Sequence, residues 1–228
     1  DDEMEGLGLN FVRYADDFSI YCKTKSDAVK AKFLVTKFLR DKLKLPINND
    51  KSGIRRPVHH QVLGFGFVPT YRKGEKGKYQ LVVTPKKFKA FKQKLKELTR
   101  KTTPMSIDER IEKLNSMIRG WMEYFKYASI QQKLIKLDGW LRNRLRYCIW
   151  HHWKRPNKKM RSLIRLGIKP DQAYAWSRTS MGGWAVAQSP ILGTTITIKR
   201  LKKRGYISMS EYFNSISPNY NNSLFPVI

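Results

Sequence analysis

Three consecutive segments carry apolar residues at helical spacing, and this pattern constrains the fold more than any other feature. The first begins at Thr84–Pro85, a pair typical of a helix start, and the second at Ser106 and Glu109, which form a capping-box pattern. The third runs into the letters W-H-H-W-K-R. The stripes are Phe88, Phe91, Leu95 and Leu98; Ile111, Leu114, Ile118, Trp121 and Phe125; and Leu134, Leu137, Leu141, Leu145 and Ile149. Residues 85–155 are therefore predicted to form a three-helix unit, with lysines over its first helix.

The segment before Thr84 has the period of strands. Residues 9–14 and 18–23 alternate, which predicts a β-hairpin with the letters A-D-D at its tip. A helix capped by Ser26 follows, reaching about Leu43, with Ala31, Leu34, Val35 and Phe38 on its inner face. Residues 61–69 and 78–83 flank a glycine-rich loop and predict a second hairpin.

Beyond Pro156 the expected helices are short. One ends at Gly167, another opens at Pro170, and Gly182–Gly183 marks a loop. Ser189–Pro190 starts a last helix that ends at Gly205, although the letters T-T-I-T-I inside it favour a strand. We expect the tail from Ser215 to be loose. The fold class is α+β: two hairpins and a helix, three basic helices and a small, mainly helical C-terminal domain.

Charge separates the chain into two parts. The formal net charge is +28, yet residues 1–50 hold 9 basic and 9 acidic side chains, so the whole excess lies after them. Such an excess repels itself unless an anion neutralises it, which favours a nucleic acid over a membrane surface as the partner. No apolar run approaches the ~18 residues of a membrane span, so we expect a soluble, cytoplasmic protein.

Cysteine and histidine add little. Cys22 and Cys148 suit reduced thiols, and the adjacent pairs His59–His60 and His151–His152 lack the spacing of a zinc site. The first letters, D-D-E-M-E, suggest a fragment of a longer protein.

Two adjacent carboxylates, Asp16 and Asp17, interrupt the apolar first hairpin. Their mutual repulsion costs stability unless a cation lies between them, and Mg²⁺ prefers carboxylate oxygens. A pair of such ions can activate a 3′-hydroxyl and stabilise a leaving pyrophosphate. The alternative is an ordinary turn, since aspartate also favours turns through its own backbone hydrogen bonds.

The letters Y-A-D-D between two apolar strands resemble the catalytic hairpin of reverse transcriptases. L-K-L-P-I-N-N-D-K-S and V-L-G-F-G-F then resemble the next motif and the primer grip of that family. I-R-G-W-M-E-Y-F and L-D-G-W-L-R-N-R-L-R-Y-C-I-W-H-H-W-K resemble the thumb, or X domain, of group II intron reverse transcriptases, called maturases. The later L-I-R-L-G-I and R-G-Y-I-S-M-S-E-Y-F resemble the same family's C-terminal end, so the resemblance covers residues 1 to about 213.

This resemblance implies an RNA-directed DNA polymerase that also aids splicing and copies its intron into DNA during retrohoming. Residues 1–84 would be the end of the palm, 85–155 the thumb, 156–214 a nucleic-acid-binding domain and 215–228 a tail. Asp16 and Asp17 would hold Mg²⁺ (or Mn²⁺), and Lys51 would lie near the incoming nucleotide. The primer and template would be bound by Tyr14, Gly64, Phe65 and Gly66. The implied partners are intron RNA, a template–primer duplex, target DNA and the missing fingers and early palm.

The basic helices supply further candidates for RNA binding. Arg142 and Arg146 share a face at i,i+4, arginine can bridge phosphates, and Trp150 or Trp153 can stack on exposed bases unless they are core residues. The candidate RNA-binding residues are Arg119, Arg142, Arg144, Arg146, Trp150, Trp153, Lys154 and Arg155. For Trp121 and Trp140 a core position is the stronger expectation.

Two departures leave alternatives open. The polymerase site of the family needs a third aspartate from an earlier strand, and no Cys/His cluster of a homing endonuclease follows residue 213. The chain alone is therefore expected to be inactive as a polymerase. The alternatives are an RNA-binding splicing cofactor without polymerase activity, or the reverse transcriptase of a CRISPR or diversity-generating system.

Overall fold

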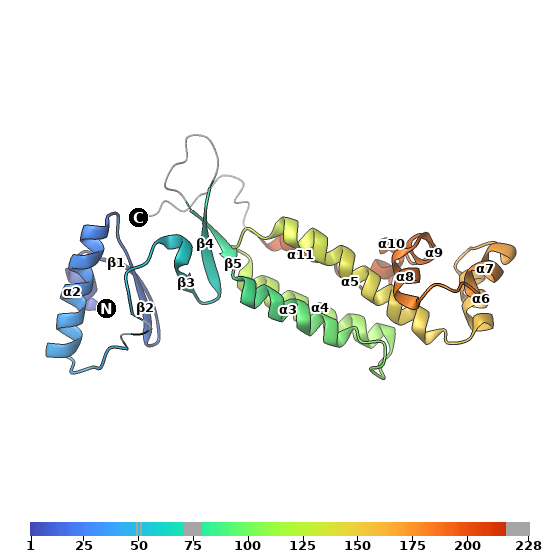
Figure 1. The fold of residues 1–228 in the computed structure, drawn as a ribbon, viewed down its shortest axis with the longest axis horizontal. Helices are drawn as coiled ribbons and strands as arrows, with labels where there is room; N and C mark the ends of the chain where they lie inside the picture. Colours follow the sequence, from blue (N-terminus) through green and yellow to red (C-terminus); the bar gives the residue numbers. More distant parts are fainter. Residues whose placement is uncertain (49, 51, 71–78, 218–228) are drawn as a thin grey trace. The chain divides into compact units, whose positions relative to one another are not determined.

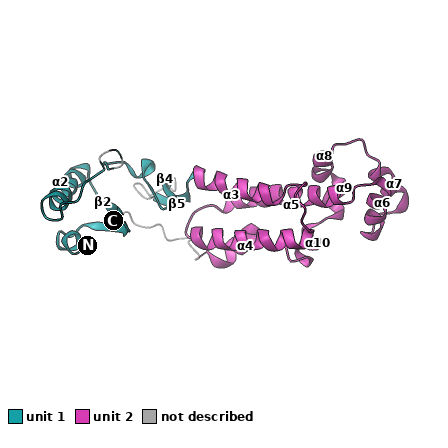
Figure 2. Ribbon diagram, turned by 90° about the horizontal axis from the view of Figure 1, so that it is seen from below, with its two compact units in different colours: residues 1–84, 219–228 teal, residues 85–218 magenta. Residues whose placement is uncertain are grey.

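The computed structural model describes residues 1–48, 50, 52–70 and 79–217 (Figure 1). These residues form two compact units, Asp1–Thr84 and Pro85–Pro218, which Figure 2 colours separately. Within them the fold is mainly helical with small antiparallel sheets, so the α+β prediction is confirmed.

The first unit begins with α1 (Asp2–Gly6) and a two-stranded hairpin of β1 (Asn10–Tyr14) and β2 (Asp17–Tyr21). Tyr14 pairs with Asp17, so the hairpin tip is only Ala15 and Asp16. The predicted tip A-D-D was one residue too long, because Asp17 already opens the second strand.

Helix α2 (Lys25–Asp41) follows the hairpin. Its cap is Thr24 rather than Ser26: the Thr24 hydroxyl accepts a hydrogen bond from the Asp27 amide at 3.1 Å. Ala31 and Val35 are buried as expected, but Leu34 is 43% exposed. The buried stripe of α2 is narrower than predicted. Among the described elements, α2 packs mainly on the single strand β2.

A second sheet has the order β3 (Gln61–Val62), β4 (Phe65–Pro69), β5 (Tyr79–Val83), all antiparallel. The predicted single strand 61–69 instead reverses at Leu63–Gly64. Before this sheet lie the short helix η1 (Pro57–His59) and His60, whose ring stacks on Phe67 at 5.9 Å between centroids and meets Tyr21 edge-on at 6.2 Å. His60 thereby connects the first hairpin to the second sheet inside this unit.

The second unit is built on α3 (Pro85–Leu98), α4 (Ile107–Phe125) and α5 (Gln131–His152). The three predicted helices are confirmed, and most of their predicted stripe residues are buried. Ser106 caps α4 by accepting from the Glu109 amide at 3.1 Å. Arg110 is a buried residue that the apolar pattern does not reveal; its guanidinium donates to the carbonyl oxygens of Leu98 and Thr103 in the α3–α4 connection.

Six shorter helices follow: α6 (Pro156–Arg165), α7 (Pro170–Ser177), α8 (Gly183–Gln188), α9 (Pro190–Thr195), α10 (Ile198–Lys203) and α11 (Met209–Ile216). Gly167, with φ +91°, ends α6 as predicted. The predicted helix from Ser189 to Gly205 is in fact two helices, because Thr197 caps a new one by accepting from the Arg200 amide at 3.3 Å. The segment T-T-I-T-I contains no strand, and α11 runs into residues predicted to be loose.

Residues 204–217, which we call the strap, run along α4 from its start to its end. Arg204 forms two 2.9 Å hydrogen bonds with Asp108, and the Asn115 side chain bonds the backbone of Gly205 and Ile207. Further along, the strap bonds Glu123 through Tyr212 and the Lys126 carbonyl through Ser217. The strap also buries Tyr206, Met209 and Phe213.

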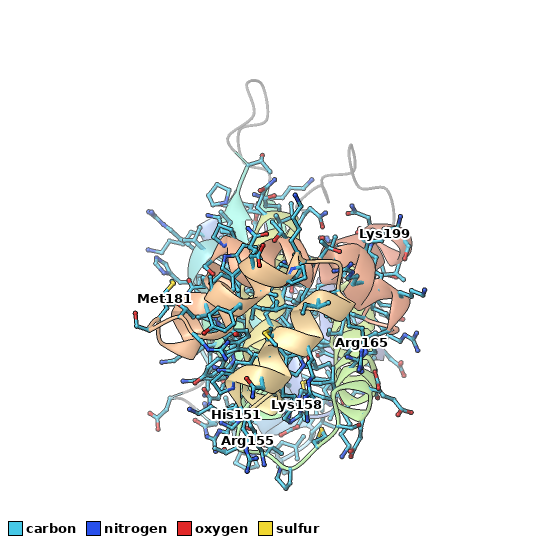
Figure 3. All side chains as sticks on the ribbon, turned by 90° about the vertical axis from the view of Figure 1, so that its right-hand side faces the viewer. His151, Arg155, Lys158, Arg165, Met181 and Lys199 are labelled. Atoms are coloured by element: carbon cyan, nitrogen blue, oxygen red, sulfur yellow. The ribbon has the colours of Figure 1, made fainter. Side chains whose placement is uncertain are left out.

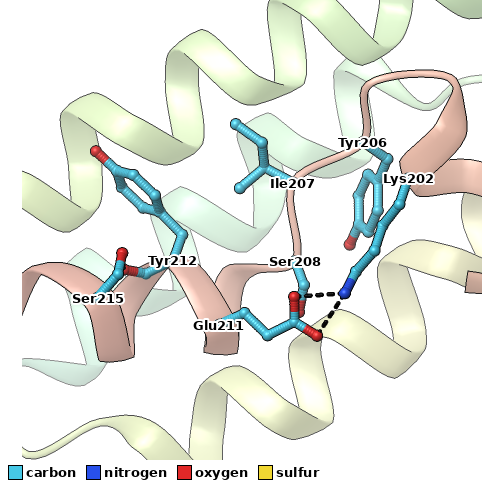
Figure 4. Close-up of a pocket in the computed structure, with 7 residues that line it drawn as sticks. All are labelled: Lys202, Tyr206, Ile207, Ser208, Glu211, Tyr212 and Ser215. Carbon is cyan, nitrogen blue, oxygen red and sulfur yellow. Dashed lines mark hydrogen bonds and ion pairs between the residues drawn. The ribbon is translucent and has the colours of Figure 1, made fainter. Parts of the chain in front are cut away.

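Asp138 of α5 fixes the start of α11. Its carboxylate is 1% exposed and accepts five hydrogen bonds of 2.8–2.9 Å, which come from Tyr206 Oη, Ser208 Oγ, the Met209 amide, and the Ser210 amide and Oγ. Figure 4 shows the adjoining shallow hollow, where Lys202 reaches Glu211 across the strap. One buried carboxylate thus accepts hydrogen bonds from three hydroxyls and two backbone amides at the start of α11.

Among the described residues, no helix is both long and apolar enough to cross a membrane.

Candidate nucleic-acid interface

The tip of the first hairpin presents Tyr14, Asp16 and Asp17 to solvent. Tyr14 is 64% exposed, and neither aspartate carboxylate forms a hydrogen bond or ion pair with a described residue. Ala15 has φ +55°, a conformation that costs a non-glycine residue on the order of 1 kcal/mol. The two-residue turn brings both carboxylates to the same end of the hairpin.

Two exposed carboxylates suit a hard divalent cation, which binds about six oxygen ligands. Two carboxylates do not make a complete metal site. In the part of the chain that the structure describes, there is no group of three or more His, Cys, Asp or Glu side chains that could hold a metal ion. The residues present therefore fit part of a magnesium site, and water or another carboxylate would fill the rest.

The turn between β3 and β4 consists of Leu63 and Gly64, with φ of +52° and +88°. Positive φ at both central residues matches the twist of a tight hairpin. Gly66 is buried, and a Cβ there would meet Thr84 and Val82 at 3.8 Å, an ordinary contact. Gly64 and Phe65 thus lie at a hairpin tip, whereas Gly66 lies within a strand. Lys51 is outside the described residues.

Helix α3 carries a dense set of lysines opposite its buried face. Lys86, Lys87, Lys89, Lys92, Lys94 and Lys96 are all exposed, and none forms an ion pair with a described residue. Lys89, Lys92 and Lys96 recur at i, i+3 and i+7 on the flank that faces α5, as the contact of Lys92 with Trp140 shows. We call these three residues the lysine row; their unpaired charges suit a phosphate backbone.

Beside this row, cations and aromatic rings alternate along the line where α3 and α5 meet. Lys92 Nζ lies 5.1 Å from the Trp140 ring centroid, and Lys101 Nζ lies 5.5 Å from that of Tyr147. The Arg144 guanidinium lies 5.7 Å from Trp140 and 5.9 Å from Trp184 of α8. We call these six residues the α3–α5 seam.

Arg144 and Arg146, both predicted to bind RNA, have protein partners in the structure. Arg144 donates to the carbonyl oxygens of Lys96 and Thr99 and to Thr99 Oγ1, at 2.7–3.0 Å, and so caps the end of α3. Arg146 donates to the carbonyl oxygens of Ile196 and Gly193. Burial lowers the pKa of each guanidinium from its usual value. Both arginines are already engaged in holding helices together.

Trp150 corrects a second prediction, because it is 4% exposed and offers no face to a base. Its ring meets Trp153 edge-on at 5.9 Å and lies 4.3 Å from Lys159 Nζ. Trp121 stacks on Phe91 at 4.2 Å and belongs to an aromatic cluster, in line with its expected core position.

The remaining predicted residues are accessible. Lys154, Arg155 and Arg119 are exposed, while Arg142 and Trp153 are half-buried. Figure 3 shows His151, Arg155 and Lys158 gathered at one side of the end of this unit, where α5 passes into α6. Lys154 and Arg155 thus belong to a basic corner separate from the lysine row.

The sequence candidates omitted the lysine row and every seam residue except Arg144. The signal was present for the lysines, since residues of one sign recur at helical spacing opposite an apolar stripe. No signal pointed to Trp184, because its neighbours Tyr147 and Arg144 are about 40 residues away and meet it only through α8. Gly183 permits that approach: a Cβ there would lie 2.9 Å from the Tyr147 ring.

Part of the chain matches a known family of protein domains. The family model described as "Group II intron, maturase-specific domain" matches residues 88–167, which span α3 to α6. No curated protein matches the chain.

Proposed function

We propose that the chain binds group II intron RNA and assists its splicing, because residues 88–167 match the model of the group II intron maturase-specific domain. The observation that carries the proposal is that this domain match coincides with the unpaired lysines of α3. Residues 85–217 hold 30 basic and 8 acidic side chains, so the binding unit is strongly cationic. Contacts to phosphate would recognise the folded shape of the RNA rather than its sequence.

The test neutralises the lysine row in the full chain. The triple variant Lys89→Gln, Lys92→Gln, Lys96→Gln should bind a group II intron RNA more weakly, and the slope of log K against log salt should fall by roughly 0.7–0.9 for each lost phosphate contact. Splicing at low Mg²⁺ should lose the assistance that the unaltered chain provides.

The matched control is Lys113→Gln on α4, whose ammonium pairs with Glu109 at 2.9 Å. It should leave both the affinity and the salt slope unchanged. A loss of binding free energy in the control of one third or more of the loss in the triple variant would mean that total charge matters and the lysine row does not.

We further propose that the chain is the C-terminal part of a reverse transcriptase, with palm, thumb and C-terminal regions at residues 1–84, 85–155 and 156–214. Support comes from the Y-A-D-D hairpin, which presents two unpaired carboxylates beside an exposed Tyr14. Asp16 and Asp17 would hold Mg²⁺, which lowers the barrier to attack by a primer 3′-hydroxyl. Gly64 and Phe65 would position the primer, and retrohoming into target DNA would follow from this polymerase.

The polymerase proposal is tested by Mg²⁺-dependent primer extension on an RNA template, with the chain alone and with a fingers and early palm polypeptide added. Extension is expected only after the addition, and Asp16→Asn should abolish it while RNA binding persists. Asp41→Asn, at the exposed end of α2, is the control and should have no effect. RNA binding without extension in every mixture would leave only the splicing role.

A further inference from the structure

We propose that the α3–α5 seam binds an unpaired stretch of RNA, with bases stacked on Trp140 and Trp184 and phosphates held by Lys92 and Lys101. This inference rests on the proposed RNA binding and names the form of RNA that one surface of the domain takes. It adds a stacking site to the phosphate contacts of the lysine row.

The seam is a continuous surface built from three helices. Lys92 and Lys101 come from α3 and the turn after it, Trp140, Arg144 and Tyr147 from α5, and Trp184 from α8. Trp140, Arg144 and Tyr147 recur at i, i+4 and i+7 and therefore share one face of α5. From Trp140 to Tyr147 the seam extends roughly 10 Å along α5 at 1.5 Å per helical residue, enough for about two nucleotides.

Arg144 fixes the positions of the two tryptophans. Its guanidinium is held by the end of α3 through the carbonyls of Lys96 and Thr99, and it lies within 6 Å of both indole rings. The two indole rings thus lie beside a guanidinium whose position is fixed by its hydrogen bonds to α3. A platform that is already ordered loses little side-chain entropy when a base stacks on it.

Unlike Arg144, Lys92 and Lys101 are free to move away from the aromatic rings that they contact. Lys92 and Lys101 are exposed, and each ammonium rests near an aromatic ring while forming no ion pair with a described residue. When a nucleotide arrives, a base can take the face of the ring and the ammonium can move to the adjoining phosphate. The cation–π contact, worth about 0.5–1 kcal/mol at exposed sites, is exchanged for a stacked base and an ion pair.

The chemistry selects unpaired RNA over duplex. The ring faces in the seam reach only bases that are not already stacked on both sides, whereas the bases of a helix are enclosed by their neighbours. Trp184 is 36% exposed, in contrast to Trp150 at 4%, so an indole face remains accessible on α8.

The experiment measures binding of the full chain to a 12-nucleotide single-stranded RNA, a hairpin RNA duplex and a group II intron RNA across a salt series. Trp184→Leu keeps apolar volume but removes the π face; it should weaken single-strand binding roughly 5- to 100-fold, with an unchanged salt slope. Trp184→Phe keeps a π face and should stay within about threefold of the unaltered chain. The indole fluorescence of the unaltered chain should be quenched by the single strand and less by the duplex.

The matched control is Tyr174→Leu on α7, an exposed aromatic that lies 3.7 Å from the Arg178 guanidinium but outside the seam. It should leave single-strand affinity unchanged; an equal loss there would overturn the assignment to the seam. If Trp184→Leu and Trp184→Phe both behave like the unaltered chain, or if the duplex binds as tightly as the single strand, the stacking site is refuted while intron binding stands. Failure to bind any of the three RNAs would refute the proposed function as well.

Discussion

At the scale of single residues, the groups that matter most in the second unit are polar and buried. Asp138 and Arg110 lie inside a helical bundle whose pattern predicts only apolar residues there, and each fastens a connection between helices. The stripe residues could be predicted because burial of apolar surface follows the helical period. The burial of the two charged residues could not be predicted. Arg110 bonds backbone carbonyl oxygens and Asp138 bonds hydroxyls and backbone amides, and the local sequence does not show that these groups lie nearby.

Replacement of Asp138 by alanine should lower the free energy of unfolding by about 3 kcal/mol or more, since five donors lose their charged acceptor in a buried place. Asp108→Ala removes an exposed ion pair with Arg204 and should cost about 1 kcal/mol or less. Chemical denaturation followed by far-UV circular dichroism measures both. Equal costs would mean that the donors around Asp138 find water instead.

His60 makes the first unit sensitive to acid. Burial, and to a smaller degree the nearby Arg55 charge, lowers the pKa of His60 below its usual 6.5, so the folded state favours the neutral ring between Tyr21 and Phe67. The stability that this provides is present above pH 6.5 and is lost as the pH falls through the lower, folded-state value. The thermal unfolding temperature should therefore fall between pH 8 and pH 5. The variant His60→Phe should show a smaller fall, because it lacks the titrating ring.

At the scale of elements, α3, α4 and α5 follow their sequence pattern. Where other elements begin or end differently from the prediction, turns and helix caps set the boundary. A strand pattern over residues 61–69 is compatible with a straight strand, but Leu63 and Gly64 turn it back. Likewise Thr197 divides an expected helix and α11 extends into a polar tail. The first two departures are local turn and cap effects, whereas the long-range hydrogen bonds of Asp138 stabilise the start of α11 beyond its local propensity.

The entry of α8 into the seam depends on one of two adjacent glycines. Gly183→Ala would place a methyl group 2.9 Å from the Tyr147 ring, so α8 and Trp184 should shift, with a loss of about 1–3 kcal/mol of stability. Gly182→Ala meets nothing within 4 Å at φ −58° and should be neutral or slightly stabilising. Denaturation curves and the emission of Trp184 distinguish the two. Identical behaviour would mean that the Tyr147 ring moves aside freely.

At the scale of the whole molecule, the two units divide charge unequally. Residues 1–84 have 16 basic and 10 acidic side chains, while residues 85–217 have a net charge of +22. This division was evident from the sequence, and it favoured a nucleic acid as the partner, because net charge depends on composition and not on folding. The choice of the lysine row and the seam as the proposed RNA-binding surfaces required the structure, since Arg144 and Arg146 donate to carbonyl oxygens at helix ends.

Binding of the full chain to intron RNA should therefore be steeply dependent on salt. If six or more phosphates are contacted, affinity should fall roughly 10³-fold or more between 50 mM and 200 mM monovalent salt. Filter binding or anisotropy at a series of salt concentrations measures this slope. A nearly constant affinity would exclude phosphate contacts as the main source of binding.

The strap has a consequence for the order in which the protein is made. Asp138 accepts from an amide 72 positions further along the chain, so the ribosome has finished α3, α4 and α5 long before their last partner exists. At translation rates of roughly 5–20 residues per second, about 4–14 seconds separate the synthesis of Asp138 from that of Ser210. During this time the Asp138 carboxylate lacks its five donors, and Tyr206, Met209 and Phe213 are not yet in place. The second unit is thus expected to reach its final form only after the strap has left the exit tunnel.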